Sequence, residues 1–221
     1  MQELSHFYCR NRIFFIFILC WVILTSPMLL FFPKEVSFSL ANSHHHPILD
    51  YFFTIITYFG DGLFIIACGL YLFFFKSKKL GAAIILTYIG SGILCSVLKN
   101  LICNPRPAFS LIDKPDFHTV PWLSTAYYKA FPSGHTTSAF AFATCLSLFC
   151  ENKKIGYYCT LIACLTAYSR IYLGQHYWED VWFGSLLGVL FSSIFYFVIV
   201  HCYSKIWDKK IPTFISKLIN P

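Results

Sequence analysis

The sequence predicts an all-α, polytopic membrane protein with six transmembrane helices and short interfacial helices in its outer loops. Of its 221 residues, 57% are hydrophobic and 20% are aromatic, whereas only 12% are charged. The mean hydropathy is +0.62, which is too apolar for a soluble domain of this length. A bilayer core about 30 Å thick requires roughly 20 apolar residues per helix. We therefore expect about six spans in a single membrane-embedded domain over residues 1–221, with no room for a second domain.

Six apolar runs supply the expected helices, because a backbone surrounded by lipid must satisfy its hydrogen bonds within its own segment. The runs cover residues 13–32, 62–75, 80–103, 134–150, 155–173 and 181–203. The first run follows Arg10 and Arg12 and resembles a signal peptide, but it is too long, so we expect a retained span. Residues 47–60 are expected to form a helix at the membrane surface that leads into the second span.

Most of the ten cysteines lie inside apolar runs or at their ends, among them Cys20, Cys68, Cys95, Cys145, Cys150, Cys159, Cys164 and Cys202. No CxxC pair with metal or redox spacing occurs. Cysteine in such positions behaves as a small hydrophobic residue, so we expect most of these thiols to be free and packed in the protein. The formal charge of +7 does not indicate a nucleic acid partner, because the basic residues form short clusters between the apolar runs.

The distribution of basic residues predicts the orientation of the six spans. With the N-terminus in the cytoplasm, 11 of the 17 basic residues lie on the cytoplasmic side. These are Arg10, Arg12, Lys76, Lys78, Lys79, Lys153, Lys154, Lys205, Lys209, Lys210 and Lys217. The outer side holds Lys34, Lys99, Arg106, Lys114, Lys129 and Arg170. The positive-inside rule thus favours six spans with both termini in the cytoplasm.

Three polar segments lie at the outer ends of these runs. They read KNLICNPRP from Lys99 to Pro107, PSGH from Pro132 to His135, and SRIYLGQHYWED from Ser169 to Asp180. Ionisable groups at membrane depth are costly and indicate a functional site. The predicted orientation brings all three segments to the same membrane surface.

These segments contain three cations without an equal number of acids, namely Lys99, Arg106 and Arg170. A phosphoryl group fits this deficit, because Arg offers a planar donor fork to phosphate oxygens and Lys a point charge. Ser133 and Gly134 precede the fourth run, so a hydroxyl and the free backbone N–H groups of a helix N-terminus would face the same anion. A simple helix start would be the plainer interpretation of Pro132, Ser133 and Gly134 if His135 and the basic residues were absent.

His176 and Asp180 are four residues apart and are expected to face each other on one helical turn. The carboxylate would fix the imidazole tautomer, so that His176 could attack phosphorus with its other nitrogen. His135 is expected to give a proton to the departing oxygen and then to activate water, since an ordinary pKa of about 6.5 suits both tasks. Three cations stabilise the phosphoryl charge in this scheme, so it requires no metal and no other cofactor.

The three segments match the signature K-x6-R-P, P-S-G-H and S-R-x5-H-x3-D of the type 2 phosphatidic acid phosphatase (PAP2) family. The chain resembles the membrane lipid phosphatase branch of that family over about residues 45–203. The resemblance implies a phosphohistidine on His176, with His135 and Asp180 in the roles given above. It also implies a lipid phosphate in the bilayer as the substrate, with undecaprenyl pyrophosphate, phosphatidylglycerol phosphate, phosphatidic acid and lipid A phosphates as candidates.

Other interpretations remain open at the level of the sequence. The phosphohistidine could pass its phosphate to an alcohol, which would make the protein a phosphotransferase. Vanadate haloperoxidases share the motifs, but they are soluble. A transporter or scaffold would be expected to pair its buried charges instead. No obligate protein partner is evident. Because the chain is compact and lacks N-x-S/T sequons, we expect a bacterial inner membrane enzyme with its site facing the periplasm.

Three further features have simple expected roles. His44, His45 and His46 are adjacent, which suits a solvated loop better than a metal site. Asp61 is expected to cap the second span, with a place in the catalytic site as the less favoured alternative. The loop of residues 108–131 is expected to determine selectivity for the headgroup.

Overall fold

The computed structural model describes residues 2–207, and side chains are described from residue 7 to residue 200. Lys209, Lys210 and Lys217, on which part of the orientation prediction depends, lie outside the described residues, as does the side chain of Lys205. Within the described range the chain is helical and contains no strand. The predicted all-α class is thus confirmed.

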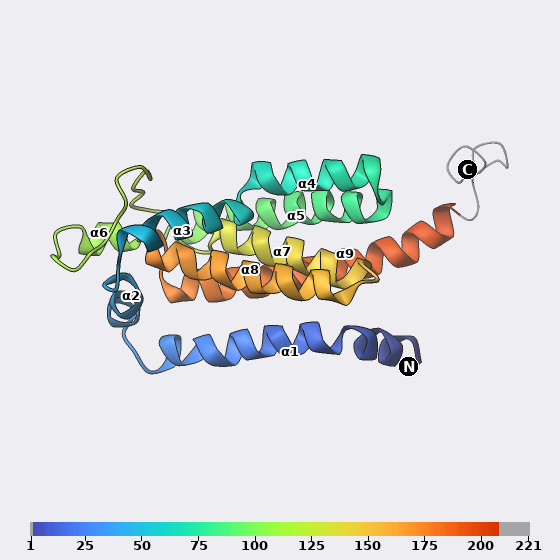
Figure 1. Ribbon diagram of the computed structural model, residues 1–221, viewed down its shortest axis with the longest axis horizontal. Helices are drawn as coiled ribbons and strands as arrows, with labels where there is room; N and C mark the ends of the chain where they lie inside the picture. The colour runs from blue at the N-terminus through green and yellow to red at the C-terminus, as the bar shows by residue number, and fades with distance from the viewer. Residues whose placement is uncertain (1, 208–221) are drawn as a thin grey trace.

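The helices follow the predicted runs closely (Figure 1). In chain order they are α1 (Gln2–Leu30), α2 (Lys34–Asn42), α3 (Pro47–Thr57), η1 (Tyr58–Gly60), α4 (Gly62–Phe75), α5 (Lys78–Ile102), α6 (Pro107–Leu111), α7 (Gly134–Phe149), α8 (Lys153–Tyr172) and α9 (Trp178–Trp207). Six of them, α1, α4, α5, α7, α8 and α9, correspond to the six predicted runs. The expected helix at residues 47–60 is formed by α3 and η1.

Three helical segments are long and apolar enough to cross a bilayer, namely Phe7–Leu30, Lys78–Leu111 and Trp178–Val200. A fourth is obtained if Pro47–Gly60 and Gly62–Phe75, which meet at a bend of 52°, are taken as one span. The described residues therefore hold three or four candidate spans by length and composition, rather than six. The physical reason is plain for α7, which has 16 residues and so a length of about 24 Å.

The centre of the bundle is α7, which packs against α5, α8 and α9. Its small side chains Ala139 and Ala143 belong to a buried cluster with Ala163 and Ala167 of α8, and small residues allow helix backbones to approach closely. Buried hydroxyls of α7 bond to the carbonyls of the preceding turn, as Thr144 Oγ1 does to Phe140 O at 2.7 Å. Hydroxyl groups inside the bundle thus lower the hydropathy of α7 without requiring contact with water.

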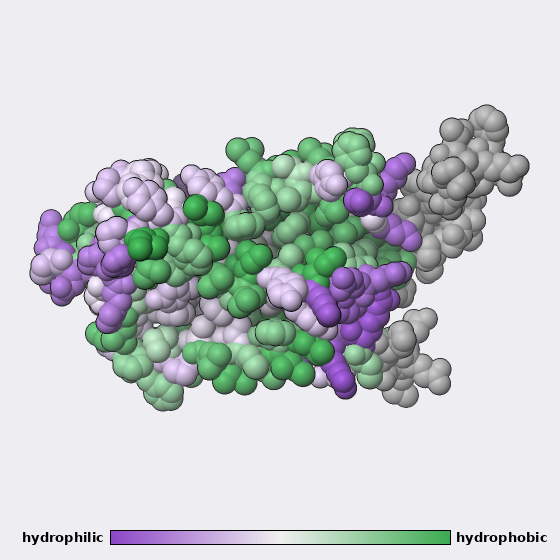
Figure 2. Space-filling model, in the orientation of Figure 1, coloured by the Kyte–Doolittle hydropathy of each residue, from purple (hydrophilic) through white to green (hydrophobic). Residues whose placement is uncertain are grey.

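The bundle has two polar ends and an apolar middle. Figure 2 shows hydrophilic side chains gathered at the two ends of the long axis and mainly hydrophobic ones between them. One end carries α2, the start of α3, and α6 with its loops, and the other carries the start of α1 and the α4–α5 and α7–α8 connections (Figure 1). All nine described cysteines are free, as predicted.

Candidate active site

The connection from α8 to α9 holds the predicted nucleophile in a tight turn. The carbonyl oxygen of Arg170 accepts hydrogen bonds from the backbone N–H groups of Gln175 at 2.9 Å and His176 at 3.1 Å. Gly174 adopts φ +72°, and a Cβ at this position would lie 2.9 Å from the carbonyl oxygen of His118. Any other residue at this position would adopt a strained backbone conformation, and its Cβ would clash with the loop of residues 108–131.

His176 and Asp180 face each other as their spacing predicts. His176 Nδ1 lies 3.2 Å from Asp180 Oδ2, and the same oxygen accepts the backbone N–H of Tyr177 at 3.0 Å. The two residues are 2% and 0% exposed. A buried carboxylate held at this position fixes the orientation of the imidazole and leaves Nε2 as the ring nitrogen available for chemistry.

The cationic residues of the three segments surround His176. Its pKa lies well below the ordinary value of 6.5, first because the ring is buried and then because of the positive charges of Arg106, Arg170 and Lys99. His135 contributes to the same shift. The structure thus brings all three sequence segments to one place, and it keeps His176 neutral there.

Arg170 is positioned by α3. Its Nη1 donates a hydrogen bond of 2.8 Å to Thr57 Oγ1, whereas its buried Nε has no hydrogen bond partner. A buried guanidinium N–H without an acceptor is costly. This donor is consistent with a site that binds an anionic ligand.

Arg106 and Lys99 are held by main-chain carbonyl groups. Arg106 Nε donates to Tyr128 O at 3.1 Å, and its Nη1 donates to the backbone and side-chain oxygens of Gln175, each at 3.2 Å. Lys99 Nζ donates to Lys129 O at 2.8 Å. In the described part of the chain none of the three cations forms an ion pair with a carboxylate. Asp180 is near enough to act on Lys99 and Arg106, but one carboxylate does not balance three cations.

The segment from Pro132 to His135 leads into the first turn of α7. Ser133 is fully buried, and its Oγ accepts a hydrogen bond from Thr136 Oγ1 at 3.0 Å. Its backbone N–H donates to the carbonyl oxygen of Asp180 at 2.9 Å, which joins this turn to α9. A Cβ at Gly134 would meet no atom within 4 Å, so open space lies beside the helix N-terminus. Such a terminus presents free N–H groups to an anion.

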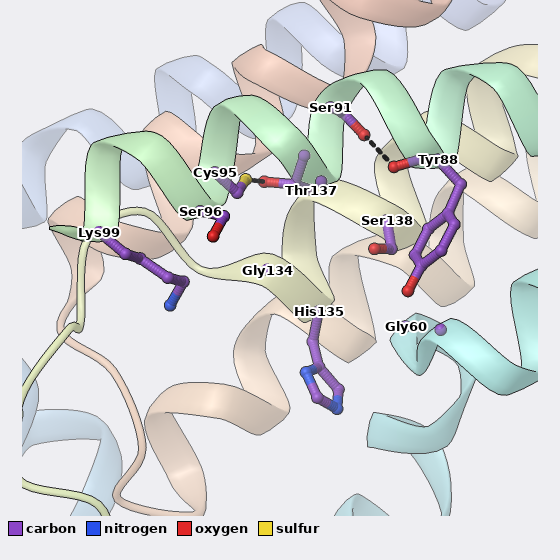
Figure 3. A pocket seen from close by; sticks show the side chains of 12 residues that line it. Gly60, Tyr88, Ser91, Cys95, Ser96, Lys99, Gly134, His135, Thr137 and Ser138 are labelled. Carbon is purple, nitrogen blue, oxygen red and sulfur yellow. Dashed lines mark hydrogen bonds between the residues drawn. The ribbon is translucent and has the colours of Figure 1, made fainter.

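A cavity of about 280 Å³ opens beside this turn. Figure 3 shows the side chains of Lys99, on α5, and His135, on α7, directed toward this space. The ring of His135 makes no hydrogen bond to the described residues, which leaves both nitrogens available to a ligand. His176 and the two arginines do not line this cavity, so the site has an open side at His135 and a closed side at His176.

Several contacts at the site carry no signal in the sequence. Thr57 and Gln175 hold the two arginines through hydrogen bonds between distant segments. Asp50 accepts hydrogen bonds from Tyr172 Oη at 2.7 Å and lies 2.8 Å from Nε2 of His118. The sequence does not indicate these pairs, because His118 and Tyr172 are 68 and 122 residues away from Asp50 in the chain.

The structure shows the roles of Asp61 and of two of the three adjacent histidines. Asp61 caps α4, as predicted, by accepting the backbone N–H of Leu63 at 2.8 Å. His46 caps α3, and the ring of His45 stacks on that of His118 with centroids 4.1 Å apart. Among the described residues no group of three or more His, Cys, Asp or Glu side chains is placed to hold a metal ion.

Comparisons with known proteins agree with this geometry. The family described as the PAP2 superfamily matches residues 80–204. The lipid A 1-phosphatase of Rhizobium etli is 29% identical over 168 residues, which cover 67% of this chain and 70% of the relative. LpxE of Aquifex aeolicus is 35% identical, with a TM-score of 0.64 over 72% of this chain and 91% of that chain.

A second solved structure extends the similarity over nearly the whole chain. It is a transmembrane PAP2-type phosphatidylglycerolphosphate phosphatase from Bacillus subtilis, 25% identical, with a TM-score of 0.61 over 94% of this chain and 99% of that chain. The matched residues 80–204 include all three polar segments. The chain therefore belongs to the PAP2 superfamily and is an integral membrane phosphatase that hydrolyses phosphoric monoesters or pyrophosphates.

Proposed function

We propose that this protein hydrolyses a lipid phosphate through a phosphohistidine on His176, without a metal ion. The observation that carries the proposal is a neutral, buried His176 surrounded by three cations that have no carboxylate partner. A neutral imidazole has the lone pair that a nucleophile needs. Lys99, Arg106 and Arg170, with Ser133 and Gly134 at the N-terminus of α7, form the phosphate cradle that compensates the charge of the phosphoryl oxygens.

The reaction proceeds in two transfers. His176 Nε2 forms a bond to phosphorus while the bond from phosphorus to the lipid oxygen breaks, and His135 donates its proton to that oxygen. Water then attacks the phosphohistidine and gives a proton to His135, and inorganic phosphate leaves His176 neutral. Asp180 keeps the Nδ1 proton in place through both steps.

The proposed arrangement in the membrane places the site at the outer surface. We propose that α1, α4, α5, α7, α8 and α9 all span the bilayer in a single domain, because α7 and α8 pack inside the bundle beside the longer apolar helices. The end with Lys76 and Lys153 is then cytoplasmic. The active site faces the periplasm of a bacterial inner membrane, which gives access to lipids of the outer leaflet.

The candidate substrates are lipid A phosphates, phosphatidylglycerol phosphate, undecaprenyl pyrophosphate and phosphatidic acid. Lipid A phosphates are favoured by the similarity to the Rhizobium etli lipid A 1-phosphatase over two thirds of the chain. Phosphatidylglycerol phosphate is supported by the Bacillus subtilis structure, which aligns over nearly the whole chain.

The mechanism is tested by rapid-quench trapping of labelled phosphoenzyme with purified protein and an aryl phosphate, in the presence of EDTA. The wild type should form phosphohistidine without added metal. His176→Ala should lose phosphoenzyme and turnover together, by at least about 10³-fold. His135→Ala should still form some phosphoenzyme, because an aryl leaving group needs little protonation, and should then stall before hydrolysis.

Asp180→Asn serves as an intermediate case in the same experiment. The amide can hold the ring but favours the wrong tautomer, so turnover should fall by roughly 10² to 10⁴-fold. Label trapped in His176→Ala, or activity lost in EDTA and restored by Mg²⁺, would show that the mechanism is wrong.

A further inference from the structure

The cavity beside His135 extends well beyond the three motif segments. It runs along α5 from Lys99 to Tyr88, which are 11 positions apart, so it follows the helix for about 16 Å. Its other wall is the first turn of α7 and the η1–α4 junction, where Gly60 packs so closely on His135 O that a Cβ would clash. Most of its lining residues therefore have no place in the phosphate cradle described above.

Three hydroxyl groups lining this cavity have no hydrogen bond partner in the described chain, namely those of Tyr88, Ser96 and Ser138. Ser138 is only 8% exposed, whereas Tyr88 is half-buried and Ser96 is exposed. Other hydroxyls in this part of the protein are paired, as Ser91 Oγ donates to Tyr88 O at 3.3 Å. A buried hydroxyl without a partner, such as that of Ser138, is unfavourable between membrane helices. Here three unpaired hydroxyls from two helices line one space (Figure 3).

The position of the cavity relative to the two histidines indicates what occupies it. In phosphoryl transfer the nucleophile and the leaving oxygen lie on opposite sides of phosphorus. His176 is buried on the closed side of the site, whereas His135, the proton donor to the leaving oxygen, lines the cavity. The group attached to the leaving oxygen must therefore extend into this cavity.

We infer that this hydroxyl-lined cavity binds the leaving group of the substrate and selects one that carries hydroxyl groups next to the scissile phosphate, such as a sugar or a glycerol. The inference rests on the proposed phosphohistidine mechanism. A volume of about 280 Å³ is near the lower end for small-molecule sites, which begin at about 300 Å³. That space suits one polar ring or a glycerol unit, while the lipid chains remain in the bilayer.

The test uses two lipids with the same acyl chains. The leaving group of phosphatidylglycerol phosphate carries a free glycerol hydroxyl, whereas that of phosphatidic acid does not. The wild type should prefer the former by about tenfold or more in kcat/KM. Tyr88→Phe, Ser96→Ala and Ser138→Ala should each lower kcat/KM for phosphatidylglycerol phosphate by about fivefold to tenfold, as expected for one lost hydrogen bond. They should leave kcat/KM for phosphatidic acid and 4-nitrophenyl phosphate within twofold of wild type.

Ser193→Ala is the matched control, because the Ser193 hydroxyl bonds within α9 to Val189 O and does not line the cavity. It should leave the preference between the two lipids unchanged. Equal losses on all substrates in the Tyr88, Ser96 and Ser138 variants, or a wild type that shows no preference for the hydroxyl-bearing lipid, would overturn the inference while leaving the proposed function intact. Absence of phosphate release from every substrate, including 4-nitrophenyl phosphate, would overturn both.

Discussion

His176 is neutral because its surroundings oppose a positive charge. The ring is buried, and Arg106, Arg170 and Lys99 all disfavour protonation. Asp180 acts in the opposite direction, but it contacts Nδ1 and thus the side of the ring away from the reacting nitrogen. The imidazole therefore keeps its lone pair free over a wide pH range, and the cations proposed to bind phosphate contribute to this.

This environment leads to a prediction about pH. A pKa well below 6.5 means that the imidazole remains neutral as the pH falls through 6.5, where an ordinary histidine takes up a proton. The ¹³Cε1 resonance of His176 in labelled protein should thus stay at its neutral position from pH 8 to about pH 5.5. His176→Gln assigns the resonance by removing it. A midpoint near pH 6.5 for this resonance would contradict the structure.

At the scale of the element, α3 supports the site from outside the motif segments. Asp50, Thr54 and Thr57 are spaced so that they share one face of the helix, and all three are buried. They contact the end of α8 through Tyr172, the outer loop through Trp122 and the phosphate cradle through Arg170. The helix therefore connects the end of α8, which carries Arg170, with the loop of residues 108–131.

The hydroxyl of Thr57 is the part of this face closest to the chemistry. Thr57→Val keeps the side-chain shape but removes the acceptor of Arg170 Nη1, so that a second buried guanidinium donor loses its partner. We expect kcat/KM to fall by about 10-fold to 100-fold, mainly through KM, and Thr57→Ser to recover most of the loss. Steady-state kinetics with 4-nitrophenyl phosphate measure both effects.

The matched control is Thr25→Val, since Thr25 is buried and bonds only to carbonyls of its own helix. It should leave KM unchanged. Equal KM values for Thr57→Val and wild type would show that α3 does not position Arg170.

The sequence predicted the long helices well because a continuous apolar run in lipid is stable as a helix, in which every backbone hydrogen bond is made within the segment. The run 62–75 has the bounds of α4, and 80–103 differs from α5 by two residues or fewer. By contrast, α2 was not predicted individually, since nine residues of mixed polarity show no clear period. The start of α1 at Gln2 was also missed. The residues before the apolar run at 13–32 include many polar ones, so the apolar pattern does not extend back to the start of the helix.

The contacts within the candidate site could be predicted where the residues are close in the sequence. His176 and Asp180 are four residues apart, and helical geometry alone places them face to face. Thr57 and Arg170 are 113 residues apart, so their contact depends on how α3 packs against α8. The hydroxyl-lined cavity likewise depends on the spacing between α5 and α7, which no local pattern specifies.

The whole molecule is polarised along its long axis. One end carries the phosphate cradle and the loop of residues 108–131, and the other carries the lysine-rich connections between α4 and α5 and between α7 and α8 (Figure 1). The apolar surface between them matches the demand of a lipid environment (Figure 2). Substrate lipids would therefore reach the cradle from one leaflet only.

The proposed orientation is tested by labelling intact cells with a membrane-impermeant maleimide, in a background where the exposed Cys9, Cys20 and Cys103 are replaced by Ser. Thr125→Cys, in the outer loop, should react, whereas Lys153→Cys should react only after the cells are permeabilised. The reverse pattern would place the site in the cytoplasm and would exclude substrates confined to the outer leaflet.

Asp180 joins the two halves of the site through two different parts of the residue. Its side chain contacts His176, and its main-chain carbonyl accepts the N–H of Ser133, two residues before His135. The second bond is independent of the side chain, so the separation of the two histidines is expected to survive substitution at position 180. Replacing a catalytic residue usually changes both the proton affinity of its partner and the alignment of the site. At Asp180, a side-chain substitution should change the proton affinity of His176 while the main-chain bond to Ser133 preserves the alignment of the two histidines.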